Sequence, residues 1–431
     1  MSAKAVAFAG CFGALLLGAD KTASAQMTPC DSAESSLPVL YVAGPSTTEG
    51  SGVLPLVQVV ANALSAWALV VYVPTPPCSA LQNLATGTPG NTAALTLNPT
   101  GSTTACMADA VAPDLAVSDV YPGTCVQNLG IAPLTSAELD FLGPVQTSAI
   151  VTASSSSEKV VSADAAYVVF GFGAANYVVS PWSDPASIFV PDEQAGPLNL
   201  IGTTIGLSPS KWAGAGDSTV TSTSNLTKAL KADATPSATI GILPGTVASQ
   251  TSGIRVLAYQ HSTEQCGFLP DSDSTHFDKI NVRQGRYALW GPTHFVVHVD
   301  AGGTVLDHSG QPSAVLRAAL DALTASAPGG AQSGPALDSS VYAEGDAGTP
   351  AIDPQRFTQA VASASFVPWC AMQVVRSADG AAEASYQAPA PCGCFFESAL
   401  GATTSLCPTC GSNADCTGTA GTCRYGYCED Q

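Results

Sequence analysis

Three hydroxyl-rich stretches carry the residues with the clearest chemical potential, and each stands between an apolar run and a helix-like pattern. The first follows the strand-like run "YVAG" and contains Ser46 and Thr47, directly before an apolar helix pattern. The first backbone N–H groups of a helix have no partner within it, and the helix dipole makes that end positive. Such a junction can hold an oxyanion with amides and hydroxyls, or the hydroxyls can simply cap the helix.

The second stretch is "LAVSDVYPGTC", in which Ser118 and Asp119 end a short apolar run. Ligands of open α/β sheets gather at the carboxyl ends of the strands. A carboxylate at that position accepts a hydrogen bond from a protonated oxyanion and offers nothing to an oxyanion that has no proton. The alternative is an Asx-type turn before Pro122.

The third stretch, "KWAGAGDSTVTSTSNLTKAL", repeats the arrangement, with a Gly-rich loop before Ser222, Thr223 and Ser224 at the start of a helix pattern. Three such loops in one chain are more informative than any one of them. The motifs G-x-S-x-G and H-E-x-x-H are both missing from the sequence, and we do not expect an enzyme.

The elements that position these loops alternate between strand and helix patterns. "PVLYVAG" and "DLAVSD" indicate strands, and "VLPLVQVVANALSAWA" has the apolar spacing of a helix. This alternation predicts an α/β lobe with a largely parallel sheet over residues 37–145. Residues 146–252 repeat the pattern as a second lobe, in which "AAYVVFGFG" fits either a strand or a buried helix. Residues 253–390 are expected to return to the first lobe with long loop insertions, and a last helix is predicted from Pro354.

The beginning of the chain and its composition indicate export. Residues 1–25 combine a short basic region, an apolar stretch and the small-x-small site Ala23-Ser24-Ala25, which predicts a signal peptide. A lipoprotein signal at Cys11 is the alternative. No later apolar run is long enough to span a bilayer as a helix, so we expect an exported protein of the periplasm or cell surface. The formal net charge of −19 disfavours nucleic acid as a partner.

Cysteine usage agrees with export, since thirteen of the 14 cysteines follow the predicted cleavage site. In an oxidising compartment they are expected to form disulfides, and their odd number leaves one without an intramolecular partner. Residues 391–431 have too few apolar side chains for a core and should form a disulfide-bonded module. The candidates are Cys30, Cys78, Cys106, Cys125, Cys266, Cys370, Cys392, Cys394, Cys407, Cys410, Cys416, Cys423 and Cys428.

Other side chains are weaker candidates. His294 and His298 are four residues apart in "THFVVHVD", but with no clear third ligand we expect no metal site. Arg283 is expected to pair with a neighbouring acid such as Asp278 rather than with a ligand. Trp290 is expected to pack structurally.

Taken in order, several motifs of residues 37–390 resemble those of the phosphate-type substrate-binding proteins of ABC importers. The resemblance is carried by "VAGPSTTEGSGVLPLV", "VSDVYP", "GPVQTSAIV", "FGFG", "TIGILPG" and the later run "FDKINVRQGRYALWGP". It implies an α/β chain with the two-lobed type II periplasmic binding protein fold and a small disulfide-rich C-terminal tail. The tail resembles the small cysteine repeats appended to surface proteins of soil bacteria.

The resemblance also implies a function. A small oxyanion, phosphate first, would be held between the lobes of a monomer without a cofactor and delivered to the membrane subunit of an ABC importer. The implied ligand-binding residues are Ser46, Thr47, Ser118, Asp119, Ser222, Thr223 and Ser224. One departure matters: the family carries an Arg in the second lobe, whereas this chain has no Arg between 156 and 254, leaving Lys211 or Arg255 as substitutes. The alternative is a surface or extracellular interaction protein that uses a degenerate binding fold plus the cysteine-rich module.

Overall fold

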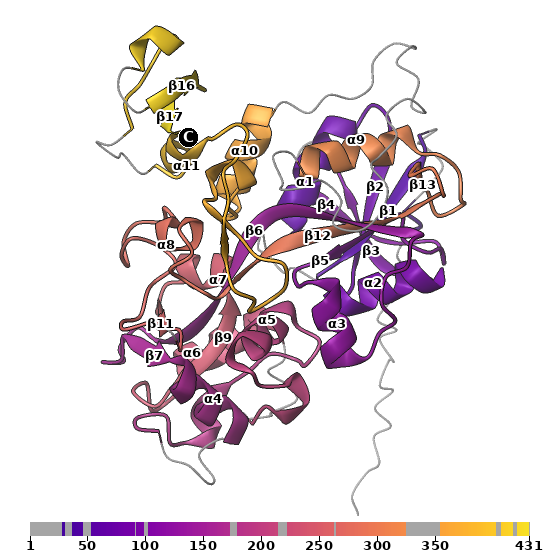
Figure 1. The fold of residues 1–431 in the computed structure, drawn as a ribbon. Coiled ribbons are helices and arrows are strands. Elements are labelled where there is room, and N and C mark those ends of the chain that lie inside the picture. The colour runs from indigo at the N-terminus through magenta and orange to yellow at the C-terminus, as the bar shows by residue number, and fades with distance from the viewer. Residues whose placement is uncertain are drawn as a thin grey trace, which may run out of the picture.

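The computed structural model shows two α/β lobes and a small C-terminal module (Figure 1). The predicted signal peptide over 1–25 and the loop residues Ser46 and Thr47 lie outside the described part. The structure describes residues 28–30, 37–45, 53–90, 92–98, 102–172, 179–213, 222–262, 264–324, 354–401, 407–416 and 420–430.

Lobe 1 is built on a mixed sheet with the strand order β4-β3-β2-β1-β5-β12-β6. The strands β1, β2 and β5 are parallel, as the alternation of strand and helix patterns predicts. The pairs β2–β3 and β3–β4 are antiparallel, and β12 is antiparallel to both β5 and β6, so the prediction of a largely parallel sheet was wrong for these strands. The bounds are β1 (Val39–Gly44), β2 (Leu69–Pro74), β3 (Ala93–Leu97), β4 (Thr103–Met107), β5 (Leu115–Ser118), β6 (Glu138–Ala153) and β12 (Trp290–Val299).

Helices cover both faces of this sheet, because successive side chains of a strand point to opposite sides. Tyr41 and Ala43 pack in one core cluster with the α2 helix, whereas Leu40 and Val42 pack in another with α1, α9 and α10. The helices of lobe 1 are α1 (Leu54–Leu64), α2 (Pro77–Thr86), α3 (Pro122–Leu129), α9 (Ala314–Leu323) and α10 (Pro354–Ser363).

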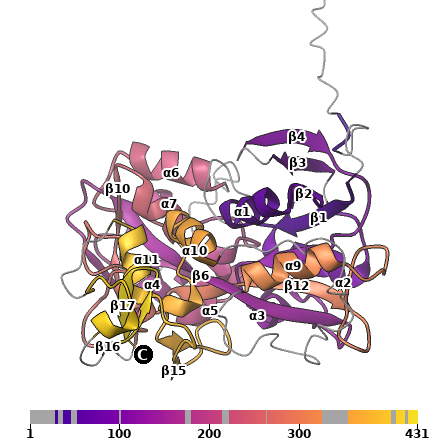
Figure 2. The same cartoon turned by 90° about the horizontal axis from the view of Figure 1, so that it is seen from above.

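Lobe 2 begins on the second half of β6, which is 16 residues long and crosses from one lobe to the other (Figure 2). That half pairs with β9 and β10, and β9 pairs with β8. The segment after residue 253 therefore first adds β10 to lobe 2 and reaches lobe 1 with β12. The bounds are α4 (Ala163–Phe172), β8 (Ile188–Phe189), α5 (Gly196–Ile205), α6 (Thr223–Ala232), β9 (Ile240–Pro244), α7 (Gly245–Gln250) and β10 (Ile254–Val256).

The two strands that connect the lobes fit closely against each other and against the C-terminal part of the chain. A Cβ atom on Gly143 of β6 would lie 2.1 Å from Cε2 of Phe295 on β12, so only glycine leaves room for that ring. The indole Nε1 of the buried Trp369 donates a hydrogen bond of 2.7 Å to the Gly143 carbonyl. The connection is thus a packed junction rather than a pair of loose linkers.

Shorter elements complete the chain. The strands β7 (Val160–Ser162) and β11 (Ala258–Gln260) form a parallel pair, and β14 (Val374–Val375) and β15 (Ala384–Ser385) form a hairpin. The others are α8 (Ile280–Arg283), β13 (Val305–Leu306), α11 (Gly393–Ala399), β16 (Ala420–Arg424) and β17 (Tyr427–Asp430), with 3-10 helices at Pro185–Ser187, Pro209–Lys211, Trp369–Ala371 and Asn413–Asp415.

The disulfides expected from the cysteine count are present. Of the thirteen cysteines after the predicted cleavage site, Cys266 is free and exposed. The other twelve form the pairs Cys30–Cys106, Cys78–Cys125, Cys370–Cys392, Cys394–Cys407, Cys410–Cys423 and Cys416–Cys428.

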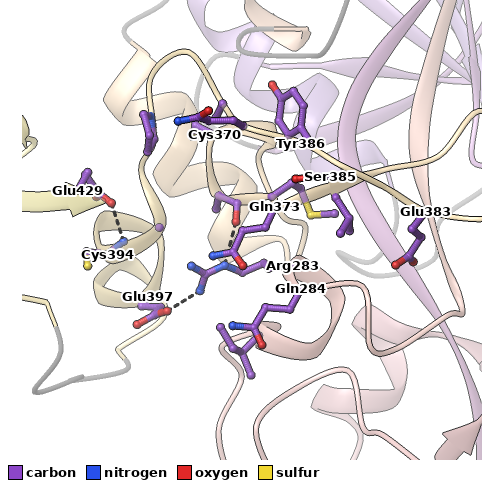
Figure 3. Close-up of a pocket in the computed structure, with 18 of the residues that line it drawn as sticks. Arg283, Gln284, Cys370, Gln373, Glu383, Ser385, Tyr386, Cys394, Glu397 and Glu429 are labelled. Atoms are coloured by element: carbon purple, nitrogen blue, oxygen red, sulfur yellow. Dashed lines mark hydrogen bonds and ion pairs between the residues drawn. The ribbon is translucent and has the colours of Figure 1, made fainter. Parts of the chain in front are cut away.

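The cysteine-rich module is attached to the body by the Cys370–Cys392 disulfide and by a buried ion pair (Figure 3). Arg283 pairs with an acid, as expected, but the acid is Glu397 of α11 rather than Asp278. Within the module, the carboxylate of Glu429 on β17 accepts hydrogen bonds from the backbone N–H groups of Cys394 and Phe395 on α11, at 3.0 and 2.9 Å. Next to these contacts is a cavity of about 960 Å³, lined by α8, the β14–β15 hairpin and the module.

No helix in the described part of the chain has both the length and the apolar character needed to cross a bilayer.

Candidate ligand site between the lobes

The strand β5 ends at the boundary between the two lobes, where the sequence predicts a ligand site. Ser118 is fully buried, and its Oγ donates to the Val120 carbonyl at 2.7 Å and accepts from the Val120 N–H at 3.2 Å. This local ring of hydrogen bonds turns the chain from β5 into α3. The Ser118 hydroxyl is therefore occupied by its own turn.

Asp119, the next residue, points toward lobe 2. Its Oδ1 is buried and has no hydrogen-bond partner among the described residues. A Cβ atom on Gly196, the first residue of α5, would lie 2.0 Å from that oxygen, so the carboxylate contacts the start of the helix where glycine leaves space. The positive end of the helix favours the negative charge, although Pro197 contributes no N–H to it.

His294 on β12 is paired with Ser118 across the sheet and provides a second buried polar atom. Its Nδ1 lies 3.0 and 2.9 Å from the two carboxylate oxygens of Asp140 on β6, and its Nε2 has no partner in the described part of the chain. The carboxylate favours a proton on Nδ1, which can be donated to it. His298, the other histidine of the pair considered for a metal, lies 3.7 Å from Glu138 instead.

Asp379, from the loop between β14 and β15, completes the cluster. Its Oδ2 accepts hydrogen bonds from the Tyr121 N–H at 2.9 Å and the Thr124 hydroxyl at 2.7 Å, at the start of α3. The residue is 4% exposed, and its Oδ1 has no partner among the residues described. Sequence reasoning missed this residue, because the run "SADG" signals only a turn.

Burial dominates the electrostatics of this cluster. It raises the pKa of Asp119 to about 7; a hydrogen bond to its own backbone opposes the shift, the Asp379 charge adds to it and His294 opposes it. Burial also raises the pKa of Asp379, although the hydrogen bonds from Thr124 and Tyr121 act in the opposite direction. The carboxyl group of Asp119 should therefore change its protonation state near neutral pH.

Replacing Asp119 with Asn should remove part of the pH dependence of stability. The pKa of this group is 3.8 without perturbation and about 7 in the folded chain. At a pH between these two pKa values, the folded protein holds a proton that the unfolded chain has released. The stability that this group contributes is therefore lost as the pH rises through about 7. The urea midpoint of the natural protein should fall further between pH 5 and pH 8 than that of Asp119→Asn. An equal fall in both proteins would contradict this expectation.

The remaining predicted site residues are arranged differently. Ser46 and Thr47 are outside the described residues, but the neighbouring Pro45 carbonyl accepts a 2.7 Å hydrogen bond from Tyr72. Ser222 is exposed and caps α6 by accepting from the Asn225 N–H at 3.3 Å, and α6 packs on β8, β9 and β10. On the lobe 2 side, Gly196 of α5 lies against Asp119. A ligand role for Ser222, Thr223 and Ser224 stays a prediction.

Arg255, a possible substitute for the missing cation, is used within lobe 2. Its guanidinium donates to the backbone carbonyls of Ser154, Ser156 and Glu158. The loop before α5 contains Asp192 and Glu193 and no basic residue. This loop therefore supplies no cation in place of the missing arginine.

Direct hydrogen bonds also join the lobes beside this cluster. Asn128 of α3 donates to Asn199 of α5 at 3.1 Å, and the Ser79 hydroxyl lies 3.4 Å from Oε1 of Gln194. The two lobes are thus in contact around Asp119.

Comparisons with known proteins add a likeness of fold. No family model matches the chain, and no curated protein matches it in sequence. An ABC-type phosphate transport receptor from Vibrio cholerae is similar to 61% of this chain over 87% of its own length, with 12% identity and a TM-score of 0.38.

Two further solved structures show the breadth of the likeness. A Clostridium perfringens protein crystallised with bound phosphate, provisionally assigned as a phosphate ABC transporter substrate-binding protein, is similar over 77% of this chain and 99% of its own, with 9% identity and a TM-score of 0.43. OxyR of Corynebacterium glutamicum is similar over 64% of this chain and 61% of its own length, with 9% identity and a TM-score of 0.32. At these identities and TM-scores the likenesses carry no conclusion about ligand or partner.

Proposed function

We propose that this chain is an exported binding protein that holds a small protonated oxyanion between its lobes, hydrogen phosphate first, and delivers it to an ABC importer. The observation that supports the proposal is the Oδ1 atom of Asp119, which is buried between the lobes without a hydrogen-bond partner in the described part of the chain. A buried acceptor without a partner is destabilising, so a ligand that donates a hydrogen bond there would be favoured.

Hydrogen phosphate meets this requirement, and sulfate does not. Above a pH of about 7, where Asp119 is ionised, hydrogen phosphate still carries a P–OH donor, whereas sulfate has no proton to give. The start of α5 lies beside Asp119 and can interact favourably with the rest of the anion. The leader-like sequence and the six disulfides support export, which an importer-associated protein needs.

Calorimetric titration of the mature protein, stripped of bound ligand, tests the proposal. Phosphate should bind in the micromolar range or tighter, and sulfate on the order of 100-fold more weakly, because it leaves the carboxylate unsatisfied. Asp119→Ala should abolish phosphate binding, while Asp321→Asn, which changes a carboxylate with 57% side-chain exposure on α9, should not. A folded sample that gives no heat with phosphate, or that binds sulfate equally well, would overturn it.

A second function is favoured by one specific observation. Carboxylates of the chain itself, Asp119 and Asp379, are packed into the boundary between the lobes, and this arrangement disfavours an added anion. The same fold with a docked cysteine-rich module would suit a surface or extracellular interaction protein. If phosphate binds neither the natural protein nor a variant without the Asp379 carboxylate, this alternative is supported.

A further inference from the structure

We infer that Asp379 is an internal ligand of the lobe boundary, a carboxylate that a disulfide-closed loop places in the anion site at the start of α3. The inference deepens the proposed function, on which it relies only for the identity of the external anion that would compete. Three independent features carry it: the hydrogen bonds at α3, the attachment of the loop to β12 and its contact with α5.

The start of α3 has the chemistry of an anion site. Pro122 is its first residue and has no N–H, and the Tyr121 N–H and the Thr124 hydroxyl are donors on either side of it. Both donate to Oδ2 of Asp379, at 2.9 and 2.7 Å. An anion in this position also interacts favourably with the helix dipole. Asp379 therefore binds where an external oxyanion would otherwise be stabilised.

The loop that carries Asp379 is fixed to lobe 1 on its other side. The Tyr121 hydroxyl donates to the Arg376 carbonyl at 2.6 Å. The Arg376 guanidinium lies 3.9 Å from the ring centroid of Trp290 and donates to the Trp290 carbonyl at 3.1 Å. Glu383, which forms an ion pair with Arg376, accepts a 2.8 Å hydrogen bond from the indole of Trp290. These contacts leave the loop little freedom to withdraw the carboxylate.

The same loop touches lobe 2. Gly380 has a φ of +68°, and a Cβ atom there would lie 3.0 Å from the Thr204 Cα and 3.3 Å from the Thr203 carbonyl oxygen on α5. Glycine is therefore required both for the backbone conformation and for the close approach. In Figure 1 the loop descends from α10 to the space between α3 and α5. One short turn thus joins the two helices that face each other across the boundary.

A disulfide closes the base of this loop. Cys370 and Cys392 are bonded, and the Cys392 N–H also donates to the Cys370 carbonyl at 2.9 Å. Closing the loop covalently reduces the number of conformations that it can adopt, so the carboxylate is presented to α3 at a lower entropic penalty. Export to an oxidising compartment would keep this bond formed.

Replacing Asp379 with Ala and adding formate tests the inference directly. Formate is a free carboxylate that fits the space left by the side chain. We expect Asp379→Ala to have a lowered melting temperature in chloride, and formate at equal ionic strength to raise it with a saturable concentration dependence. The natural protein and Asp300→Ala, which removes an exposed carboxylate that accepts from Gly302 and Thr304, should show no such rise. Equal responses of all three proteins would overturn the inference.

Phosphate titration of the same variants separates this inference from the proposed function. If Asp379 competes with the anion, Asp379→Ala should bind phosphate about tenfold more tightly than the natural protein. If formate raises the melting temperature of Asp379→Ala and phosphate binds neither this variant nor the natural protein, the internal ligand is supported and phosphate capture is rejected. If the natural protein and Asp379→Ala bind phosphate with equal affinity and formate does not raise the melting temperature of the variant, the internal ligand is rejected and phosphate capture is supported. If the alanine variant does not fold, the phosphate affinity of Asp379→Asn, which keeps the side-chain volume and removes the charge, is compared with that of the natural protein instead.

Discussion

Replacing Glu397 with Ala should lower the free energy of unfolding by about 3–5 kcal/mol, because it leaves the charge of Arg283 buried without its partner. Arg283 is 4% exposed, and the remaining contact of its Nε is a 3.0 Å hydrogen bond to the Ala371 carbonyl. Since this ion pair attaches α11 to α8, the cysteine-rich module should also become accessible to protease. Urea unfolding with the disulfides intact, together with limited proteolysis, measures both effects.

A double variant distinguishes a buried charge from lost packing. Arg283→Met with Glu397→Met removes both charges and keeps apolar volume, and such replacements are often neutral or stabilising. The double variant should therefore recover most of the stability that Glu397→Ala loses. If it is as unstable as the single variant, the ion pair is not the cause.

Replacing Cys78 and Cys125 together with Ser should destabilise lobe 1 by about 4 kcal/mol, on a chain-entropy argument for a loop of this length. The two cysteines are 47 residues apart and join α2 to α3, and both are buried in the core beneath the sheet. Because α3 carries the contacts with Asp379 and α5, the variant should also loosen the lobe boundary. Hydrogen exchange of the α3 amides would report this second effect.

The matched control is the pair Cys410 and Cys423, which closes a loop with a sequence separation of 13 inside the module. Its replacement should disorder the module and leave the unfolding of the lobes almost unchanged. Equal destabilisation of the lobes by the two double variants would show that the effect does not depend on the α2–α3 link.

Local patterns were sufficient to predict much of the fold. The runs "PVLYVAG" and "DLAVSD" contain the parallel strands β1 and β5, and the apolar spacing after the first loop corresponds to α1. The predicted helix start at Pro354 is the first residue of α10. The run "AAYVVFGFG" fitted a strand or a helix, because a short apolar segment cannot decide between them by periodicity. Its residues as far as Phe172 belong to α4.

The candidate site was less accessible to sequence reasoning, because its decisive contacts are distant along the chain. Ser118 and Asp119 were predicted from their place at the end of a strand, and that place is confirmed. The partners of Asp119 and α3 could not be predicted in the same way. Thr124 and Asp379 are 255 residues apart in sequence. Gly196 follows a loop that has no hydroxyl residue, so nothing in the sequence marked it as part of a site. No local signal encodes a pairing that only the tertiary fold creates.

The place of β12 between β5 and β6 also sets the order in which the chain can fold. The strands β5 and β6 are consecutive along the chain, yet each is hydrogen-bonded to β12, which begins only at Trp290. Until that strand is available, both have an unpaired edge, and the elements from α4 to β10 precede it in sequence. Such edges are prone to pair with other chains. A chain truncated before β12 should therefore aggregate, because the edges of β5 and β6 stay unpaired.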